Sequence, residues 1–205
     1  MTAANENAIT RSTPFTRRNL WLSIVAVALG QAAVLGWMIW DRASLLANGR
    51  EVVLDVIPVD PRSLFRGDYV ILGYDISRYT LPPGTEVPQR GAPFYVTLRK
   101  GADDAWQAIA GSSTPPASIA ADDVVIRGKV DYASAARQDS ADTGPVVALR
   151  YGIESFFVPE GTGRELEHMV RHKKISAVVA VNGSGEAAIK GLMSDGKRVY
   201  EEPLL

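Results

Sequence analysis

An uncharged apolar run near the N-terminus is the feature that most restricts how this chain can fold. It extends from Leu20 to Trp40, LWLSIVAVALGQAAVLGWMIW, for 21 residues. An α-helix of that length, rising about 1.5 Å per residue, covers roughly 30 Å, the thickness of the hydrocarbon core of a bilayer. Trp21 lies near one end and Trp37 and Trp40 near the other, where indole rings prefer the membrane interface. We therefore expect a single transmembrane helix over residues 20–40, in contact with membrane lipid.

The charges beside this run predict its orientation. The preceding segment, residues 1–19, holds three arginines against one glutamate and has no apolar periodicity, so we expect a disordered tail. The near flank on the other side starts with Asp41 and Arg42. Because basic flanks stay in the cytoplasm, the tail is expected there and the C-terminal part outside.

A cleaved signal peptide is the competing interpretation of the same run. Two features argue against it. The run is longer than the ~7–15 apolar residues of a signal peptide, and the residues that follow, 41–47, offer no small-x-small cleavage site. We therefore expect an uncleaved signal anchor in a single-pass protein.

Three small residues, Ala28, Ala32 and Gly36, repeat at every fourth position of the run and lie on one helix face, with Gln31 nearby. Such a face allows close packing against another transmembrane helix. A polytopic membrane protein is the partner expected there. Small residues are also common in membrane segments, so a chance arrangement is the alternative.

The rest of the chain reads as short strands separated by turns, after an expected linker over residues 41–50. Runs rich in β-branched and aromatic residues alternate with Pro- and Gly-rich breaks. We predict strands over Glu51–Val59, Tyr69–Ile76, Phe94–Arg99, Ala105–Ala110, Val124–Tyr132, Val146–Tyr151, Ile175–Val181, Glu186–Met193 and Arg198–Glu201. The expected fold of residues 51–205 is mainly β, an antiparallel barrel- or sandwich-like domain with hairpin turns near Asn182-Gly183-Ser184-Gly185 and Ser194-Asp195-Gly196.

One amphipathic helix interrupts these strands. Thr162 and Glu165 form a capping box, and Leu166, Met169 and Val170 then share one helix face. The helix is expected to end near residue 173.

Composition and the two histidines exclude several kinds of site. The chain has no cysteine, which removes disulfides and thiolate metal ligands, and its net charge of −1 argues against a nucleic-acid binder. His168 and His172 stand four residues apart on the expected helix, a spacing that can hold a metal. The neighbouring basic residues would repel a cation, so we expect no metal and no cofactor.

The most distinctive stretch runs from Val56 to Ile76 and contains a turn at Arg66-Gly67-Asp68. Gly and Asp accept the backbone angles of a tight reversal. After the turn, period-two alternation places Val70, Leu72, Tyr74 and Ile76 on one strand face, and Tyr69, Ile71 and Asp75 on the other. Through Gly67, Asp68, Tyr69, Leu72 and Tyr74 the stretch resembles the GDYXXLXY proteins. That resemblance implies a bacterial, membrane-anchored protein without an assigned activity. With the orientation expected from the flanking charges, the domain would lie in the periplasm, anchored to the inner (plasma) membrane. The resemblance supplies no catalytic residues.

A second block, Leu149 to Gly161, also resembles a segment of GDYXXLXY proteins and contains Glu154. Arg62 and Arg66 of the first block could clamp a carboxylate or phosphate, or could pair with the nearby Asp60 and Asp68. A salt bridge from Glu154 to Arg62 or Arg66 would unite the two blocks.

The signature residues of the two blocks form the candidate site, and they either bind a ligand or only shape the fold. They are Arg62, Arg66, Gly67, Asp68, Tyr69, Leu72, Tyr74 and Glu154. The sequence offers no convincing catalytic set, so we expect a membrane-anchored binding or assembly module. A membrane-anchored hydrolase that uses the Arg, Asp and Glu side chains of the two blocks is the alternative.

Overall fold

The computed structural model describes residues 17–57, 69–101, 104–134, 144–157, 175–194 and 196–201. The chain divides into two compact units, residues 1–41 and residues 42–205. Each unit is considered by itself.

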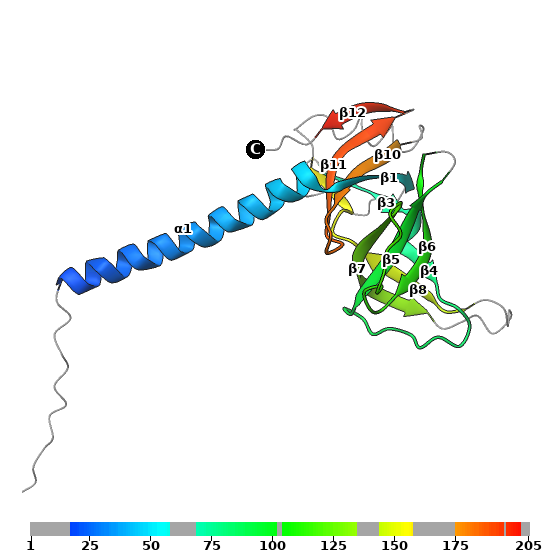
Figure 1. Ribbon diagram of the computed structural model, residues 1–205, viewed down its shortest axis with the longest axis horizontal. Coiled ribbons are helices and arrows are strands. Elements are labelled where there is room, and N and C mark those ends of the chain that lie inside the picture. The colour runs from blue at the N-terminus through cyan, green and yellow to red at the C-terminus, as the bar shows by residue number, and fades with distance from the viewer. Residues whose placement is uncertain are drawn as a thin grey trace, which may run out of the picture. The chain divides into compact units, whose positions relative to one another are not determined.

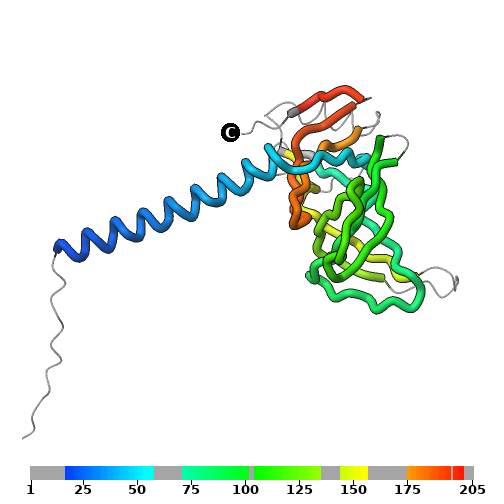
Figure 2. The backbone as a smooth tube through the Cα atoms, in the orientation of Figure 1, coloured from blue at the N-terminus to red at the C-terminus, as the bar shows by residue number. Residues whose placement is uncertain are grey.

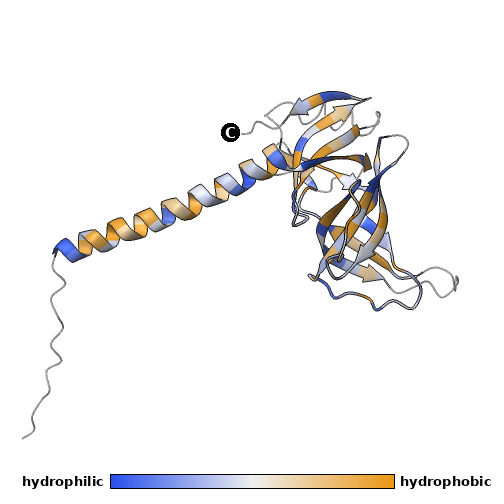
Figure 3. Cartoon of the chain, viewed as in Figure 1, coloured by the Kyte–Doolittle hydropathy of each residue, from blue (hydrophilic) through white to orange (hydrophobic). Residues whose placement is uncertain are grey.

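The N-terminal helix α1 (Arg17–Asn48) is long and apolar enough to cross a membrane, and Figure 3 shows the apolar colouring along most of its length. It extends past the apolar run, so residues 41–48, expected to form a linker, are helical. These residues contain neither Gly nor Pro, and therefore nothing in them stops a helix before Gly49. The next strand begins at Arg50.

The last turn of α1 belongs to the second unit and packs on its sheet. Leu45 and Leu46 are buried in a small cluster with Ala180 and Ala188. Gly49 follows, and a Cβ atom there would lie 2.9 Å from the Cβ of Ala180. Small residues on both sides thus let the helix end approach the sheet closely.

Twelve strands make up the second unit within the described residues, and all of their pairings are antiparallel. The first sheet has the order β12-β11-β10-β1-β3. Its strands are β1 (Arg50–Ile57), β3 (Gly73–Tyr74), β10 (Ile175–Val181), β11 (Ala187–Ser194) and β12 (Lys197–Glu201). Figure 1 shows the four labelled long strands of this sheet beside one another.

The second sheet has the order β4-β8-β7-β5-β6. Its strands are β4 (Arg78–Thr80), β5 (Pro93–Lys100), β6 (Trp106–Ser112), β7 (Asp123–Ser134) and β8 (Val146–Arg150). A separate pair joins β2 (Tyr69–Ile71) to β9 (Ser155–Phe157). Figure 2 shows the long connection from β4 to β5 running past the end of the second sheet. The predicted fold class, an antiparallel β domain plus one apolar N-terminal helix, is confirmed.

The two sheets share one hydrophobic core. Alternate residues of β1 and β5, such as Val52, Leu54, Val96 and Leu98, are at most 1% exposed. Strand β10 is buried along nearly its whole length because one side faces this core while Ala180 contacts the helix end. That double burial explains its almost continuous apolar sequence.

The strand predicted over Tyr69–Ile76 is interrupted. The chain pairs first with β9 and then with β1, and the short 3-10 helix η1 (Asp75–Ser77) follows. Leu72 lies at the change of partner, and its N–H donates to the carbonyl of Glu154 at 2.8 Å. The predicted alternation nevertheless holds for the buried side chains of Leu72, Tyr74 and Ile76.

Strand β9 was not predicted; three residues followed by a Pro/Gly segment give little periodic signal. The amphipathic helix expected over residues 162–173 lies outside the described residues.

Candidate functional site

The two signature blocks form one structural unit, which we call the clasp: residues 69–76 together with residues 151–157. Its backbone is joined through the β2–β9 ladder, where Tyr69, Val70 and Ile71 pair with Phe157, Phe156 and Ser155. The Leu72 bond to Glu154 extends this ladder by one step. Two blocks far apart in the sequence are therefore held together by main-chain hydrogen bonds.

Two buried tyrosines fasten the clasp from inside. The hydroxyl of Tyr74 donates to the carbonyl oxygen of Ile153 at 2.7 Å, and the hydroxyl of Tyr151 donates to that of Ile76 at 2.6 Å. Each block thus contributes one donor and one acceptor. Burial, and secondly the nearby negative charge of Glu154, raises the pKa of both phenols well above the usual value. Both hydroxyls therefore remain protonated donors at neutral pH.

Glu154 closes the loop that follows β8. Its carboxylate oxygens accept hydrogen bonds from the backbone N–H groups of Tyr151 at 2.5 Å and of Gly152 at 2.9 Å. Gly152 has a φ of +83°, a conformation that glycine adopts without strain. The carboxylate is thus engaged in shaping a turn.

The structure locates some of the predicted site residues. Leu72 and Tyr74 are buried parts of the clasp, Tyr69 begins β2, and Glu154 caps the loop. Arg62, Arg66, Gly67 and Asp68 lie outside the described residues, as do His168 and His172. The salt bridge expected between Glu154 and Arg62 or Arg66 therefore stays a prediction.

A groove of about 650 Å³ lies beside the clasp. The loop after β8 forms one wall, with Tyr151, Gly152 and Glu154, and the hairpin between β10 and β11 contributes Glu186. The floor is the outer face of β7 and its neighbours β5 and β8. The volume lies within the range of about 300–1,000 Å³ that is typical of small-molecule sites.

A glycine on the groove floor lets the clasp pack closely against the second sheet. A Cβ atom on Gly128 would lie 3.0 Å from two ring carbons of Tyr151. The ring lies against the bare backbone of β7 and is only 7% exposed. The floor, the wall and the clasp are therefore one packed structure.

The side chains above this floor are mostly basic. Arg127, Lys129 and Arg150 all line the groove and are exposed. Arg127 pairs with Glu186 of the hairpin at 2.8 Å, and Arg150 pairs with Asp131 at 3.0 Å. This arrangement can attract an anionic group into the groove.

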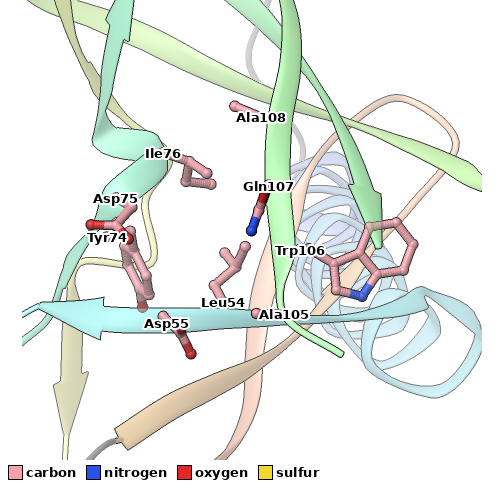
Figure 4. A pocket seen from close by; sticks show the side chains of 9 residues that line it. All are labelled: Leu54, Asp55, Tyr74, Asp75, Ile76, Ala105, Trp106, Gln107 and Ala108. Atoms are coloured by element: carbon pink, nitrogen blue, oxygen red, sulfur yellow. The ribbon is translucent and has the colours of Figure 1, made fainter. Parts of the chain in front are cut away.

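A second, smaller pocket of about 150 Å³ opens between β1, η1 and the start of β6. Leu54 and Ile76 point toward its centre, whereas the ring of Trp106 lies on the far side of β6 (Figure 4). The hydroxyl of Ser176 donates to Asp55 at 2.9 Å. This pocket is a narrow opening onto the core, too small for most ligands.

Sequence reasoning missed the basic residues of the groove. Alternation along the strand predicted over Val124–Tyr132 places Arg127 and Lys129 on its polar face, and this signal was available. The nearness of Arg150 depends on the register of β7 with β8, which strand patterns alone do not reveal.

Neither the curated proteins nor the solved structures gave a match. The family described as GDYXXLXY protein matches residues 31–192, well over half of the chain. The match includes the last part of the apolar run, both blocks of the clasp and every residue of the groove. An apolar N-terminal helix together with this family fits a membrane-anchored protein, and the chain belongs to the GDYXXLXY protein family.

Proposed function

We propose that this chain is a single-pass protein of the bacterial inner membrane that presents its β domain outside the cytoplasm as a binding or assembly module. The observation that carries the proposal is the groove. The clasp builds its wall, while the side chains that face into it are exposed and charged. A wall held by hydrogen bonds beside exposed charged side chains is suited to binding.

The engagement of Glu154 favours binding over the alternative hydrolase. A general acid or base needs a carboxyl group that can reach a substrate proton. Both carboxylate oxygens of Glu154 instead accept backbone N–H groups of its own loop. Arg62, Arg66 and Asp68, the other members of the hydrolase hypothesis, lie outside the described residues.

The orientation of the protein can be tested with fusions to the C-terminus. Alkaline phosphatase folds and works only outside the cytoplasm, whereas green fluorescent protein exported in unfolded form does not fluoresce there. We expect phosphatase activity from the first fusion and no fluorescence from the second. Fluorescence without phosphatase activity would place the β domain in the cytoplasm and contradict the proposal.

The expected polytopic partner can be tested by co-purification of the full chain in mild detergent. Ala32 and Gly36 lie on the small-residue face of α1. We expect Ala32→Leu and Gly36→Leu to reduce recovery of a co-expressed multi-span membrane protein because the larger side chains prevent close helix packing. Ala26→Leu adds the same volume as Ala32→Leu on a different face and should leave recovery unchanged. Equal recovery with all three variants would rule out this face as the contact.

A further inference from the structure

Two positive side chains lie directly opposite each other on the groove floor. Lys129 of β7 is in register with Arg150 of β8, and both are exposed and line the groove. Like charges at directly opposed positions of an antiparallel pair are destabilising. The fold therefore retains an unfavourable pair at this position, although nearly any neutral residue would remove it.

The nearby carboxylates of the described residues have partners other than Lys129. A β-bulge between Val130 and Tyr132 makes Asp131 an extra residue in its strand. Asp131 forms ion pairs with Arg150 at 3.0 Å and with Arg90 at 3.6 Å. Lys129 forms no ion pair with any of the described residues.

The third basic residue of the groove, Arg127, has a carboxylate partner, as Arg150 does. Glu186 receives Arg127 at 2.8 Å and the side-chain amide of Asn182 at 3.1 Å. The remaining carboxylate, Glu154, is bound by two backbone N–H groups. The uncompensated charge of the groove is thus concentrated at Lys129, next to the guanidinium of Arg150.

We propose that the groove binds a ligand through an anionic oxo group, a carboxylate or a phosphate, held by Lys129 and Arg150. The planar guanidinium offers paired donors and the ammonium a mobile point charge, and both suit such oxygens. An anion between the two side chains would also relieve their repulsion. The inference deepens the proposed function and rests on it for the role of the groove.

Opposed like charges are not a general property of these sheets, because no other pair of like charges stands directly opposite in the described strand registers. Elsewhere Lys190 on β11 pairs with Glu51 at 2.8 Å, and Glu51 also accepts Arg198 at 3.2 Å. The chain as a whole has a net charge of −1. The local excess of positive charge is therefore a feature of the groove.

The test uses the full chain in micelles of a non-ionic detergent and three probes: citrate, inorganic phosphate, and a short-chain anionic phospholipid added to the micelles, with a short-chain zwitterionic phospholipid as blank. Titration calorimetry measures all three. We expect binding that weakens as salt rises. Binding of citrate or phosphate would identify a free anion, whereas binding of the anionic phospholipid alone would identify a lipid headgroup.

The decisive variant is Lys129→Met, which keeps most of the aliphatic side chain and removes the charge. We expect at least a tenfold loss of affinity. Lys197→Met is the matched control because Lys197 is an exposed lysine on β12, outside the groove, and it should bind as the unaltered chain does. The melting temperature of Lys129→Met without ligand should be unchanged or higher, because the repulsion with Arg150 is gone, so a loss of binding cannot come from misfolding.

Two results would overturn the inference: no binding of any of the three probes by the unaltered chain, or equal binding by Lys129→Met. Neither result bears on the fusions or the co-purification described above. A cytoplasmic C-terminus would in turn refute the proposed function while leaving a measured anion affinity intact.

Discussion

Tyr74 and Tyr151 show how single residues of the signature act through structure. Both are found where a buried hydroxyl meets a carbonyl of the other block. If the donor is removed, the buried carbonyl has neither water nor protein as a hydrogen-bond partner, and this destabilises the fold. The sequence predicted that Tyr74 shares a strand face with Leu72 and Ile76, and all three are buried. Its link to Ile153, seventy-nine positions away, required the fold.

The first prediction concerns these two hydroxyls. We expect Tyr74→Phe and Tyr151→Phe each to lower the free energy of unfolding by about 1–3 kcal/mol, because Ile153 or Ile76 loses a hydrogen-bond donor. Urea unfolding of the full chain in detergent micelles, followed by tryptophan fluorescence, measures the change. Tyr132→Phe is the control, since Tyr132 is 53% exposed. If all three variants unfolded alike, the hydroxyls would not hold the clasp together.

At the scale of elements, periodic strands were predicted well and connections poorly. The strand over Ile175–Val181 has the predicted bounds because its apolar, β-branched run is uninterrupted. Strand β9 was not predicted because it is three residues long and pairs with β2 through its backbone. So short a strand does not produce a recognisable side-chain pattern. The register of β7 with β8 shifts at the bulge at Asp131, and side-chain alternation does not reveal a one-residue irregularity of that kind.

The second prediction concerns the hairpin between β10 and β11, whose turn was expected near residues 182–185. Gly185 has a φ of +83°, and a Cβ atom there would lie 3.0 Å from the backbone nitrogen of Arg127. We expect Gly185→Ala to lower the free energy of unfolding by about 1–3 kcal/mol through this strained conformation. Gly183→Ala serves as the control because nothing lies within 4 Å of its Cβ position. Equal urea midpoints for the two variants would contradict the tight contact between hairpin and β7.

The third prediction concerns the pairing of β5 with β7. Arg99 and Asp123 are opposite each other in register, and two hydrogen bonds of 2.7 and 2.8 Å join them. The bonds from Arg99 hold the pKa of Asp123 below its usual value, and Lys190 does the same for the pKa of Glu51. A carboxyl with a lowered folded-state pKa contributes stability above its unfolded pKa of about 4, and that contribution is lost as the pH falls through the lower value.

We therefore expect the free energy of unfolding to fall between about pH 5 and pH 3. Arg99→Gln should be less stable than the unaltered chain at pH 7, and the difference should shrink in acid. Urea titrations at a series of pH values measure this. Arg78→Gln is the control, because Arg78 is exposed and has no ion pair among the described residues. A difference for Arg99→Gln that is constant with pH would show that Asp123 does not depend on the pair.

At the scale of the whole molecule, the sequence separated two kinds of apolar surface correctly. The run over residues 20–40 is exposed in the structure, as a segment that contacts lipid should be, whereas the apolar strands are buried in one core. The boundary between them was harder to predict. Leu45 and Leu46 come shortly after Asp41 and Arg42, and their sequence pattern predicted neither a strand nor a membrane segment. Both are nevertheless buried against Ala180 of β10 and Ala188 of β11.

The fourth prediction follows from this boundary. Leu46 is 5% exposed, so Leu46→Ala should lower the free energy of unfolding of the β domain by about 2–5 kcal/mol. The apolar run is unchanged in this variant, and it should therefore stay in the membrane fraction after an alkaline carbonate wash. Leu35→Ala is the matched control, since Leu35 is 59% exposed within the run and makes no contribution to the core of the domain. We expect it to unfold at the urea midpoint of the unaltered chain. If Leu46→Ala also unfolded at that midpoint, the helix end would be an anchor only, and the stability of the β domain would arise without it.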